Sequence, residues 1–441
     1  MKKLFLSFIA AAFCLVSVLP SSAMESQFGG YWYTRFFSNQ NFTGEDQSEE
    51  EDVRIVDTKT RLYYTAVFHE NLKFVNKFEF DAEWGDGILG DIGADGKVFE
   101  IKNSYADFNL GPVNFTVGIQ GLTFSRGLWF DDDASGAAVT YQSDSMDLQF
   151  FWLKAYEGGA GKDANDYDVD YCGFNPVFRF GGAWEINPFF MYVYSDDVRN
   201  WKNDDGDSIF GNAEEVNLWY AGMNLDANFD MASFWLTGIY QGGDMSFYTK
   251  DQNQDFSAWL AAAGASVNIG EKADIHGQFF YATGDDGKDD GKDNDWENFW
   301  VPKGQSYYWA ELMGYGIIDY NYSNNSPGDQ ISNIMAANIG IGFKPVSNVS
   351  ITLNVWYAAL AEDILVYKGE KYPQENVKTP DNASKENYLG TEVDLIFSVE
   401  LVQGMNLDLI GAYLFAGEAT TLDSKDDSNP YELGAQLSLE F

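Results

Sequence analysis

The chain has 441 residues, of which 68 are Asp or Glu and 27 are Lys or Arg, so its formal net charge at pH 7 is −41. Proteins that bind phosphate-rich partners carry clustered basic surface, so this charge excludes a nucleic-acid-binding function. Acidic disordered chains are poor in aromatic residues, whereas this chain is 17% Phe, Trp and Tyr and has 43 glycines. Such a composition is typical of many strands joined by turns.

Residues 1–23 have the pattern of a signal peptide. Two lysines precede an apolar run that ends at Leu19, and small residues follow up to Ala23. This predicts export, cleavage between Ala23 and Met24, and a single domain over residues 24–441. Beyond Met24 every long charge-free stretch is interrupted by Gly, Pro or Asn, so any crossing of a membrane must use strands.

Apolar and polar residues alternate with period two along much of the chain, which predicts strands with one apolar and one polar face. The clearest examples are residues 72–84, 349–357, 391–401 and 431–441. A soluble sandwich also alternates, so the connections must distinguish the two folds.

Along the chain, short turns alternate with long acidic loops. The long loops lie near residues 40–53, 85–97, 121–135, 157–167, 196–213, 242–254, 284–330, 362–388 and 417–430. Nine long loops imply nine hairpins. We therefore predict an all-β fold, a transmembrane antiparallel up-and-down β-barrel of about 18 strands, with 16 as the fallback. Its long loops are extracellular, and its short turns and both termini are periplasmic.

The chain ends in an alternating strand whose last residue is Phe441. This ending resembles the C-terminal signature by which the barrel-assembly machinery recognises bacterial outer-membrane barrels. It implies that the protein lies in the outer membrane, surrounded by lipid and lipopolysaccharide.

A second resemblance lies in residues 117–141, VGIQGLTFSRGLWFDDDASGAAVTY, with supporting segments at 93–108 and 168–174. It resembles the homotrimeric outer-membrane porins of sulfate-reducing bacteria, in which a GIQGL strand leads into a loop with an FDDD run. The resemblance implies a passive diffusion channel, a trimer, and a third loop folded into the lumen.

The polar faces of the second to fourth strands line the predicted lumen. They carry five cations and five anions: Asp57, Lys59, Arg61, Lys73, Lys77, Glu79, Asp81, Glu83, Glu100 and Lys102. We predict that the five cations form a basic strip facing three acids of the third loop, Asp131, Asp132 and Asp133. A transverse field of this kind restricts ion passage. The alternative is that the wall charges neutralise one another in pairs.

Arg126 belongs to the same predicted loop. It either pins the inward loop to these three acids or is a solvated loop arginine.

The acidic excess lies mostly in the long loops, which predicts a modest cation preference at low salt. Asp204, Asp205 and Asp207 are candidate Ca²⁺ ligands, but they lack the spacing of a calcium loop. We therefore predict no cofactor and no metal site, with Ca²⁺ at these loops as the alternative.

Aromatic residues are expected on the lipid-facing surface and glycines in turns, rather than in a packed core. Trp84, Tyr357, Tyr431 and Phe441 lie near strand ends, which suits the membrane interface. For Trp356 we favour packing over stacking on a sugar ring. We expect the polar-walled lumen to hold water rather than a plug.

The sequence therefore predicts a porin for passive diffusion of small hydrophilic solutes and ions. Two alternatives stay open: a substrate-selective channel for a sugar or organic acid, and a structural or sheath barrel. No catalytic residue is predicted, because the chain has only His69 and His276 and no G-x-S-x-G motif. Both histidines fall on the side of the barrel away from the outer surface.

Overall fold

The computed structural model describes residues 24–41, 52–86, 90–92, 99–159, 167–202, 208–211, 213–247, 253–285, 295–318, 327–367, 383–421 and 429–441. Their strands are β1 (Glu25–Gln40), β2 (Val53–His69), β3 (Leu72–Glu83), β4 (Glu100–Leu110), β5 (Val113–Phe124), β6 (Phe130–Gln142), β7 (Met146–Tyr156), β8 (Val169–Phe180), β9 (Trp184–Ser195), β10 (Ala213–Asn228), β11 (Ala232–Phe247), β12 (Gln254–Ile269), β13 (Ala273–Ala282), β14 (Asp295–Trp296), β15 (Ile334–Val346), β16 (Val349–Tyr367), β17 (Ala383–Val402), β18 (Met405–Ala416) and β19 (Tyr431–Glu440). The helices are η1 (Ser125–Gly127), a 3₁₀ turn, and α2 (Glu418–Thr421).

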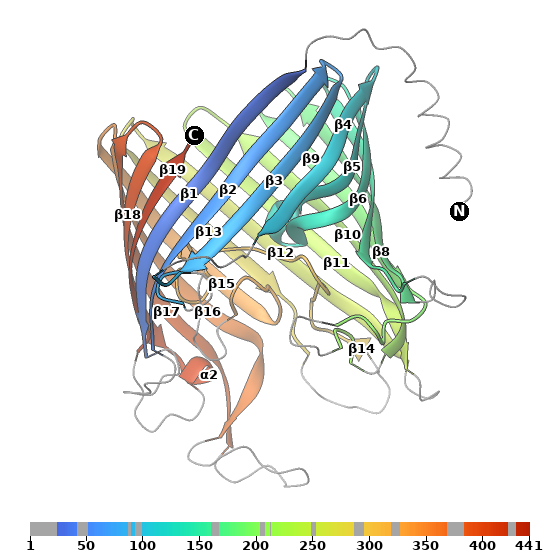
Figure 1. Ribbon diagram of the computed structural model, residues 1–441. Helices are drawn as coiled ribbons and strands as arrows, with labels where there is room; N and C mark the ends of the chain where they lie inside the picture. The colour runs from blue at the N-terminus through green and yellow to red at the C-terminus, as the bar shows by residue number, and fades with distance from the viewer. Residues whose placement is uncertain are drawn as a thin grey trace.

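The strands form a closed antiparallel barrel (Figure 1), because β1 pairs with β2 on one side and with β19 on the other. The seam runs from the pair Tyr31 and Glu440 to the pair Gln40 and Tyr431. β14 has two residues and pairs in parallel with β12, outside the barrel's own order. The barrel therefore has 18 strands, which confirms the predicted fold class and strand number.

Short turns gather at one end of the barrel, together with the start of β1 and the end of β19 (Figure 1). We call this the short-turn end and the opposite one the long-loop end. One short turn was not predicted, at residues 181–183 between β8 and β9. The predicted loop at 121–135 is shorter than expected, because β5 extends to Phe124 and β6 begins at Phe130.

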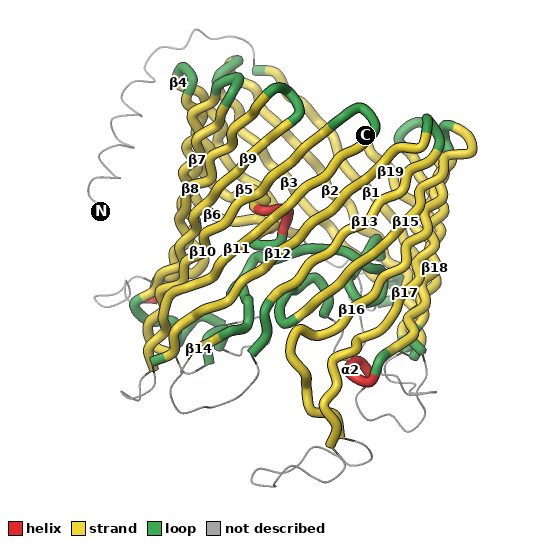
Figure 2. The backbone as a smooth tube through the Cα atoms, turned by 180° about the vertical axis from the view of Figure 1, so that it is seen from behind, coloured by secondary structure: helices red, strands yellow, loops and turns green. Residues whose placement is uncertain are grey.

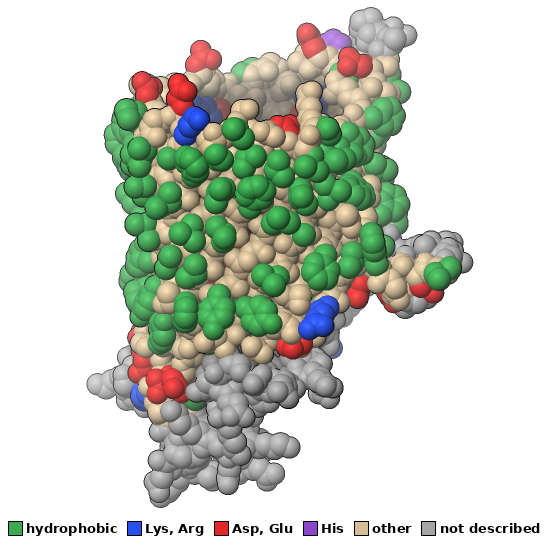
Figure 3. Space-filling model, turned by 90° about the vertical axis from the view of Figure 1, so that its left-hand side faces the viewer, with side chains coloured by type: hydrophobic (Ala, Val, Ile, Leu, Met, Phe, Trp, Pro, Cys, Tyr) green, Lys and Arg blue, Asp and Glu red, His purple; other side chains and the backbone are tan. Residues whose placement is uncertain are grey.

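The outer surface is a broad apolar band (Figure 3), with charged side chains near its two edges. Large apolar side chains on the outward face of each strand are well exposed, such as Ile339, which is 63% exposed, and Leu433, which is 57% exposed. Such a band matches the hydrocarbon layer of a membrane. Among the described residues, no helix is long and apolar enough to span a bilayer.

Three of the aromatic residues expected near strand ends face outward: Trp84 is 59% exposed, Tyr357 45% and Phe441 61%. Trp84 and Phe441 directly follow β3 and β19, whereas Tyr357 lies in the middle of β16, because this strand extends to Tyr367. Trp356 instead points inward, is 2% exposed and packs edge-on against Trp309, with 5.1 Å between ring centroids. Packing is thus the role the structure gives Trp356.

The hairpin of β5 and β6 leaves the barrel wall at its long-loop half. Pairing of β4 with β5 stops at Ser104 and Ile119, and pairing of β6 with β7 stops at Gly136 and Leu153. Beyond these points the two strands pair only with each other. Gly118 lies at the bend with a φ of 135°, and a Cβ there would come within 2.3 Å of the Ser104 carbonyl oxygen. Only glycine fits this close approach, and Figure 2 shows η1 at the hairpin tip inside the barrel.

A packed apolar core lies inside the barrel, and the expectation of a lumen free of such a core is wrong. Inward-facing residues of β7 to β13 pack at the long-loop half against the hairpin tip and against residues 297–318, which also fold inward (Figure 1). Trp129 of the tip is fully buried, with ring contacts to Phe124, Phe151, Tyr171 and Tyr220. Strand alternation alone could not reveal this, because an inward apolar residue on a strand looks like an outward one.

Candidate functional site

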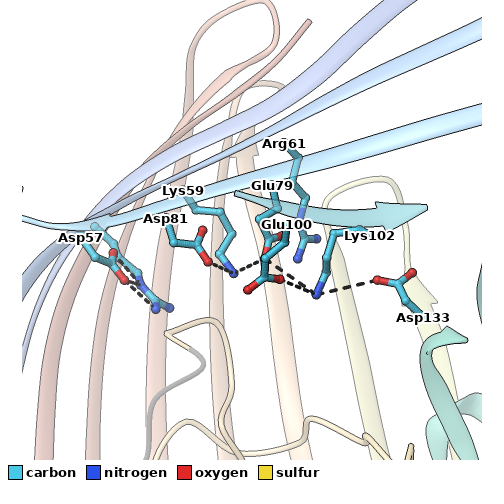
Figure 4. A network of polar contacts seen from close by, with 9 residues as sticks. Asp57, Lys59, Arg61, Glu79, Asp81, Glu100, Lys102 and Asp133 are labelled. Carbon is cyan, nitrogen blue, oxygen red and sulfur yellow. Dashed lines mark hydrogen bonds and ion pairs between the residues drawn. The ribbon is translucent and has the colours of Figure 1, made fainter. Parts of the chain in front are cut away.

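The wall formed by β1 to β4 carries a chain of charged side chains that face the lumen (Figure 4). Glu79 of β3 lies at its centre and its side chain is only 3% exposed. Three cations surround the Glu79 carboxylate: Arg61, which contacts Oε2, Lys59 at 3.3 Å and Lys102 at 3.9 Å. A buried carboxylate is costly unless it is paired and hydrogen bonded, so these cations hold Glu79 ionised.

The row of charged side chains continues in both directions around the wall (Figure 4). Toward β1, Lys59 lies 3.6 Å from Asp81, and Asp57 of β2 is bound by Arg35 at 2.8 Å. Toward the inward hairpin, Lys102 lies 3.6 Å from Glu100 and 3.8 Å from Asp133. The predicted cations and acids therefore come together, but as a ladder of alternating charge rather than as a separate basic strip.

Two predicted cations lie further toward the short-turn end. Lys73 is 46% exposed at its side chain and lies 4.0 Å from Asp107. The Lys77 ammonium lies 5.8 Å from the centroid of the Tyr63 ring. These two lysines are not part of the ladder.

The three acids of the hairpin have separate surroundings. Asp131 accepts a hydrogen bond from the Thr123 hydroxyl at 2.6 Å, and Asp132 accepts one from the backbone N–H of Asp133 at 2.7 Å. Of the three, Asp133 is the one for which an ion pair to the charged wall is observed among the described residues.

Arg126 reaches across the lumen from the tip of the hairpin. Its Nη1 donates to Asn224 at 3.2 Å and to Thr237 at 3.1 Å, and its Nη2 pairs with Asp226. The guanidinium also lies over the Trp235 ring at 4.8 Å. The prediction that Arg126 pins the hairpin to Asp131, Asp132 and Asp133 is thus wrong in its partner, because the acid it contacts is on β10.

The tip is held in a left-handed backbone conformation, with φ of 51° at Ser125 and 61° at Arg126. Such conformations are uncommon for residues other than glycine and need support from their surroundings. Residues 304–306 provide it: Gln305 donates to the Leu128 carbonyl at 2.8 Å, and the Gly304 carbonyl accepts from the Asp131 N–H at 2.7 Å. The hairpin tip and the segment 297–318 therefore form one inner layer.

A buried carboxyl cluster fixes the other end of this inner layer. Glu311 of the segment is 4% exposed, and it meets Glu392, Asp394 and Glu432 of β17 and β19, which are 0%, 2% and 0% exposed. Glu392 accepts hydrogen bonds from the backbone N–H groups of Leu312 at 2.7 Å and Met313 at 3.0 Å. Burial raises the pKa of Glu311 to about 7, and the nearby charge of Glu392 acts in the same direction.

The residues that anchor the inner layer were not predicted as site residues. Glu392 and Glu432 stand on the polar faces of the strands expected at 391–401 and 431–441. Their position on a lumen face was therefore readable from the alternation. The sequence did not reveal that the segment 297–318 folds inward and covers them.

Other predicted residues lie outside the site or outside the described residues. Met24 directly precedes β1, whereas Ala23 and the calcium candidates Asp204, Asp205 and Asp207 lie outside the described residues. Among the described residues, no group of three or more His, Cys, Asp or Glu is arranged to hold a metal ion.

The two histidines sit on strands at the short-turn half. His69 ends β2 and accepts a hydrogen bond from the Asn71 N–H at 3.2 Å. His276 of β13 contacts Asp274 at 2.7 Å through Nδ1 and Asn354 at 2.9 Å through Nε2. Both ring nitrogens of His276 thus have partners on the barrel wall.

Comparison with solved structures places the fold among outer-membrane porins. OccAB4 of Acinetobacter baumannii superposes with a TM-score of 0.55 at 11% identity, covering 95% of this chain and 98% of that one. OpdK of Pseudomonas aeruginosa, solved with vanillate, gives 0.53 at 11% identity, covering 95% and 98%. OprD of the same organism gives 0.52 at 11% identity, covering 94% of each chain. At this identity the likeness concerns the fold alone.

Sequence comparison gives a family. The comparison with curated proteins finds no match. Residues 94–433 match a family described as alginate export. The comparisons thus support a porin-like barrel, but not the porin family of sulfate-reducing bacteria that residues 117–141 resemble. The chain belongs to the alginate export family and has the fold of outer-membrane β-barrel proteins such as OprD.

Proposed function

We propose that the protein is a porin through which small hydrophilic solutes and ions diffuse passively across the outer membrane. The charged ladder between β1 and the inward hairpin carries this proposal. Apart from Glu79 and Arg35, its groups are partly exposed on the lumen side, from 20% at Asp133 to 49% at Glu100. Charged groups exposed on an inner wall suit a path filled with water.

The direct test is conductance. The refolded protein in a planar bilayer should give discrete steps of current in potassium chloride. A folded barrel that inserts but passes no current would rule out a porin and leave the structural or sheath barrel.

Selectivity is proposed to be a modest preference for cations at low salt, fading as salt screens the charges. The alternative of a substrate-selective channel, for a sugar or an organic acid, is compatible with the same lumen. The reversal potential in a salt gradient measures the ion preference.

Replacing Glu79 should shift this preference toward anions. Glu79→Gln removes one negative charge and leaves Arg61, Lys59 and Lys102 without their shared counter-ion. The reversal potential should move toward that of an anion-selective pore, most clearly at low salt, where the Debye length exceeds about 10 Å. Glu271→Gln, in the exposed turn before β13, is the control and should leave the potential unchanged. An equal shift in both variants would mean that the ladder does not set the field.

The environment of the protein is proposed to be the outer membrane, with lipopolysaccharide in its outer leaflet, after export on residues 1–23. A homotrimer is proposed from the resemblance of residues 117–141 alone. Crosslinking of the protein in native membranes tests it. Calcium in the long loops stays a prediction, checked by melting temperature with and without a chelator.

Phe441 is proposed to be the recognition signal for the barrel-assembly machinery. Its backbone closes the barrel seam, because the Gly30 N–H donates to the Phe441 carbonyl at 2.8 Å and the Phe441 N–H donates to the Gly30 carbonyl at 3.2 Å. Phe441→Ala retains these backbone bonds and removes only the ring. In cells, the amount of folded protein in the outer membrane should therefore decrease, while the yield of refolding in detergent should be nearly unaffected. Equal losses in both settings would assign the ring a role in stability instead.

A further inference from the structure

Two cavities open inside the barrel on the short-turn side of η1. The first has a volume of about 390 Å³ and is lined by η1 and by polar residues of β9 and β10, among them Asn187, Asn224 and Asp226. The second, of about 340 Å³, is lined mainly by amide and hydroxyl side chains of β4 to β8, among them Gln149 and Asn175. Both volumes fall at the lower end of the range for small-molecule sites, roughly 300–1,000 Å³.

Hydrogen bonds between side-chain amides join the two cavities. Asn175 donates to Gln149 at 3.2 Å, Asn187 donates to Asn175 at 2.8 Å, and Asn224 donates to Asn187 at 2.7 Å. These four residues belong to the consecutive strands β7, β8, β9 and β10. We call them the amide belt. Because each amide orients the next, the belt is ordered before any solute arrives.

The belt keeps hydrogen-bonding capacity for a solute. A side-chain amide has two N–H donors and two acceptor lone pairs. In the observed contacts, Asn175 uses one donor and one lone pair, so one of each remains. Asn224 is fully used, since its amide also donates to Ser125 and its oxygen accepts from Thr237 and Arg126. Asn224 therefore positions the belt, and Asn175 is free to bind.

The charges near the belt are already neutralised. Arg126 pairs with Asp226, and Arg179 pairs with Asp147 and lies 3.4 Å from Glu185. An anionic solute would have to break one of these pairs to gain a cation. A hydroxyl group needs no such exchange, because it donates to the partly exposed carboxylates of Asp226 and Glu185 and accepts from an amide N–H.

We infer that the amide belt is a binding subsite for uncharged, hydroxyl-rich solutes of about the size of a sugar ring. This inference rests on the proposed function as a channel and names the class of solute that the channel favours. The oriented amides of the belt, with paired charges beside them, can bind hydroxyl groups. A polyanion would instead require cations that lack partners.

Three probes of one ring size test the inference in liposomes that contain the full-length refolded protein. D-glucose is neutral, D-glucuronate is an anion and D-glucosamine is a cation. The swelling rate should be highest for D-glucose and should saturate with concentration. In the bilayer, D-glucose should lower the ion current in a saturable manner, and neither charged probe should match it.

Asn175→Leu keeps the branching and the number of side-chain heavy atoms, removes the free donor and acceptor, and should raise the half-saturating D-glucose concentration by about ten-fold. Gln149→Leu, at the end of the belt, serves as a second variant should Asn175→Leu fail to fold. The matched control is Asn354→Leu on β16, a lumen amide outside both cavities that is hydrogen bonded to His276 and Asn338. It should leave the D-glucose response unchanged.

The inference is overturned if the three probes cross at equal rates, if D-glucuronate is preferred, or if both belt variants respond like wild type. These failures differ from a failure of the proposed function, which would show as no ion current at all. Ion current with no preference among the probes would retain the porin and remove the subsite.

Discussion

Raising the pH from about 5 to about 8 is expected to weaken the docking of the segment 297–318 on the barrel wall and to increase the ion current. Glu311 anchors this segment, and burial raises its pKa to about 7 from the ordinary value of 4.5. At a pH between these two pKa values, the Glu311 carboxyl is protonated in the docked segment and ionised in the released one. Docking is at full strength below pH 4.5, weakens as pH rises, and has lost about 3 kcal/mol above pH 7.

The groups around Glu311 favour this direction. Glu392 and Asp394 of β17 and Glu432 of β19 are acids, and Arg35 of β1 is the cation near them, already paired with Asp57. A negative charge on Glu311 would thus be added to an acidic surrounding. The two backbone N–H groups that Glu311 accepts from, at 2.8 Å from Ile317 and 3.5 Å from Ile318, only partly offset it.

Glu311→Gln is the matched variant, because glutamine keeps the acceptor oxygen and cannot ionise. Its current should stay low and steady across the pH range, while the wild type becomes larger or noisier toward alkaline pH. Single-channel recording at several pH values measures this. A wild-type current without pH dependence, or the same pH response in Glu311→Gln, would contradict a role for Glu311.

Removing the Arg126 side chain is expected to free the hairpin tip. Arg126→Ala loses the ion pair with Asp226 and the hydrogen bonds to Asn224 and Thr237. Charge-assisted hydrogen bonds contribute about 1.5–3 kcal/mol each when partly buried. Even the lower figure raises the population with the tip released by about ten-fold. Larger and more variable single-channel currents should follow.

Arg126→Lys separates charge from geometry, since lysine keeps the charge but cannot contact three partners in one plane. It should behave between the wild type and Arg126→Ala. Arg179→Ala, which removes a wall arginine that is 39% exposed, is the control and should leave the current steady. Identical currents in Arg126→Ala and wild type would mean that the apolar inner layer holds the tip by itself.

Apolar contacts also hold the hairpin tip in the inner layer. Trp129 and Leu128 of the tip are fully buried, and a fully buried large apolar side chain contributes about 1.5–3 kcal/mol. Release of the tip in Arg126→Ala should therefore be partial, with the polar anchor lost and the apolar contacts retained.

The sequence by itself determined the barrel. Period-two alternation shows which residues share a face of a strand, and the alternation of short and long connections gives the number of hairpins. These signals are local in the sequence, so they can be identified without a structure. They placed Lys59, Arg61, Glu79 and Lys102 on one lumen wall, as the structure does.

Only the tertiary structure decided what fills the barrel. The partner of Arg126 is Asp226, one hundred residues away along the chain, and Glu311 meets Glu392 and Glu432 from two further strands. A strand pattern gives the face of each residue but not which loop returns to cover it. The physical reason is that apolar residues look alike whether they face lipid or an inner core, so the general expectation of aromatic residues on the lipid-facing surface fails for Trp129 and Tyr220, which lie inside the barrel.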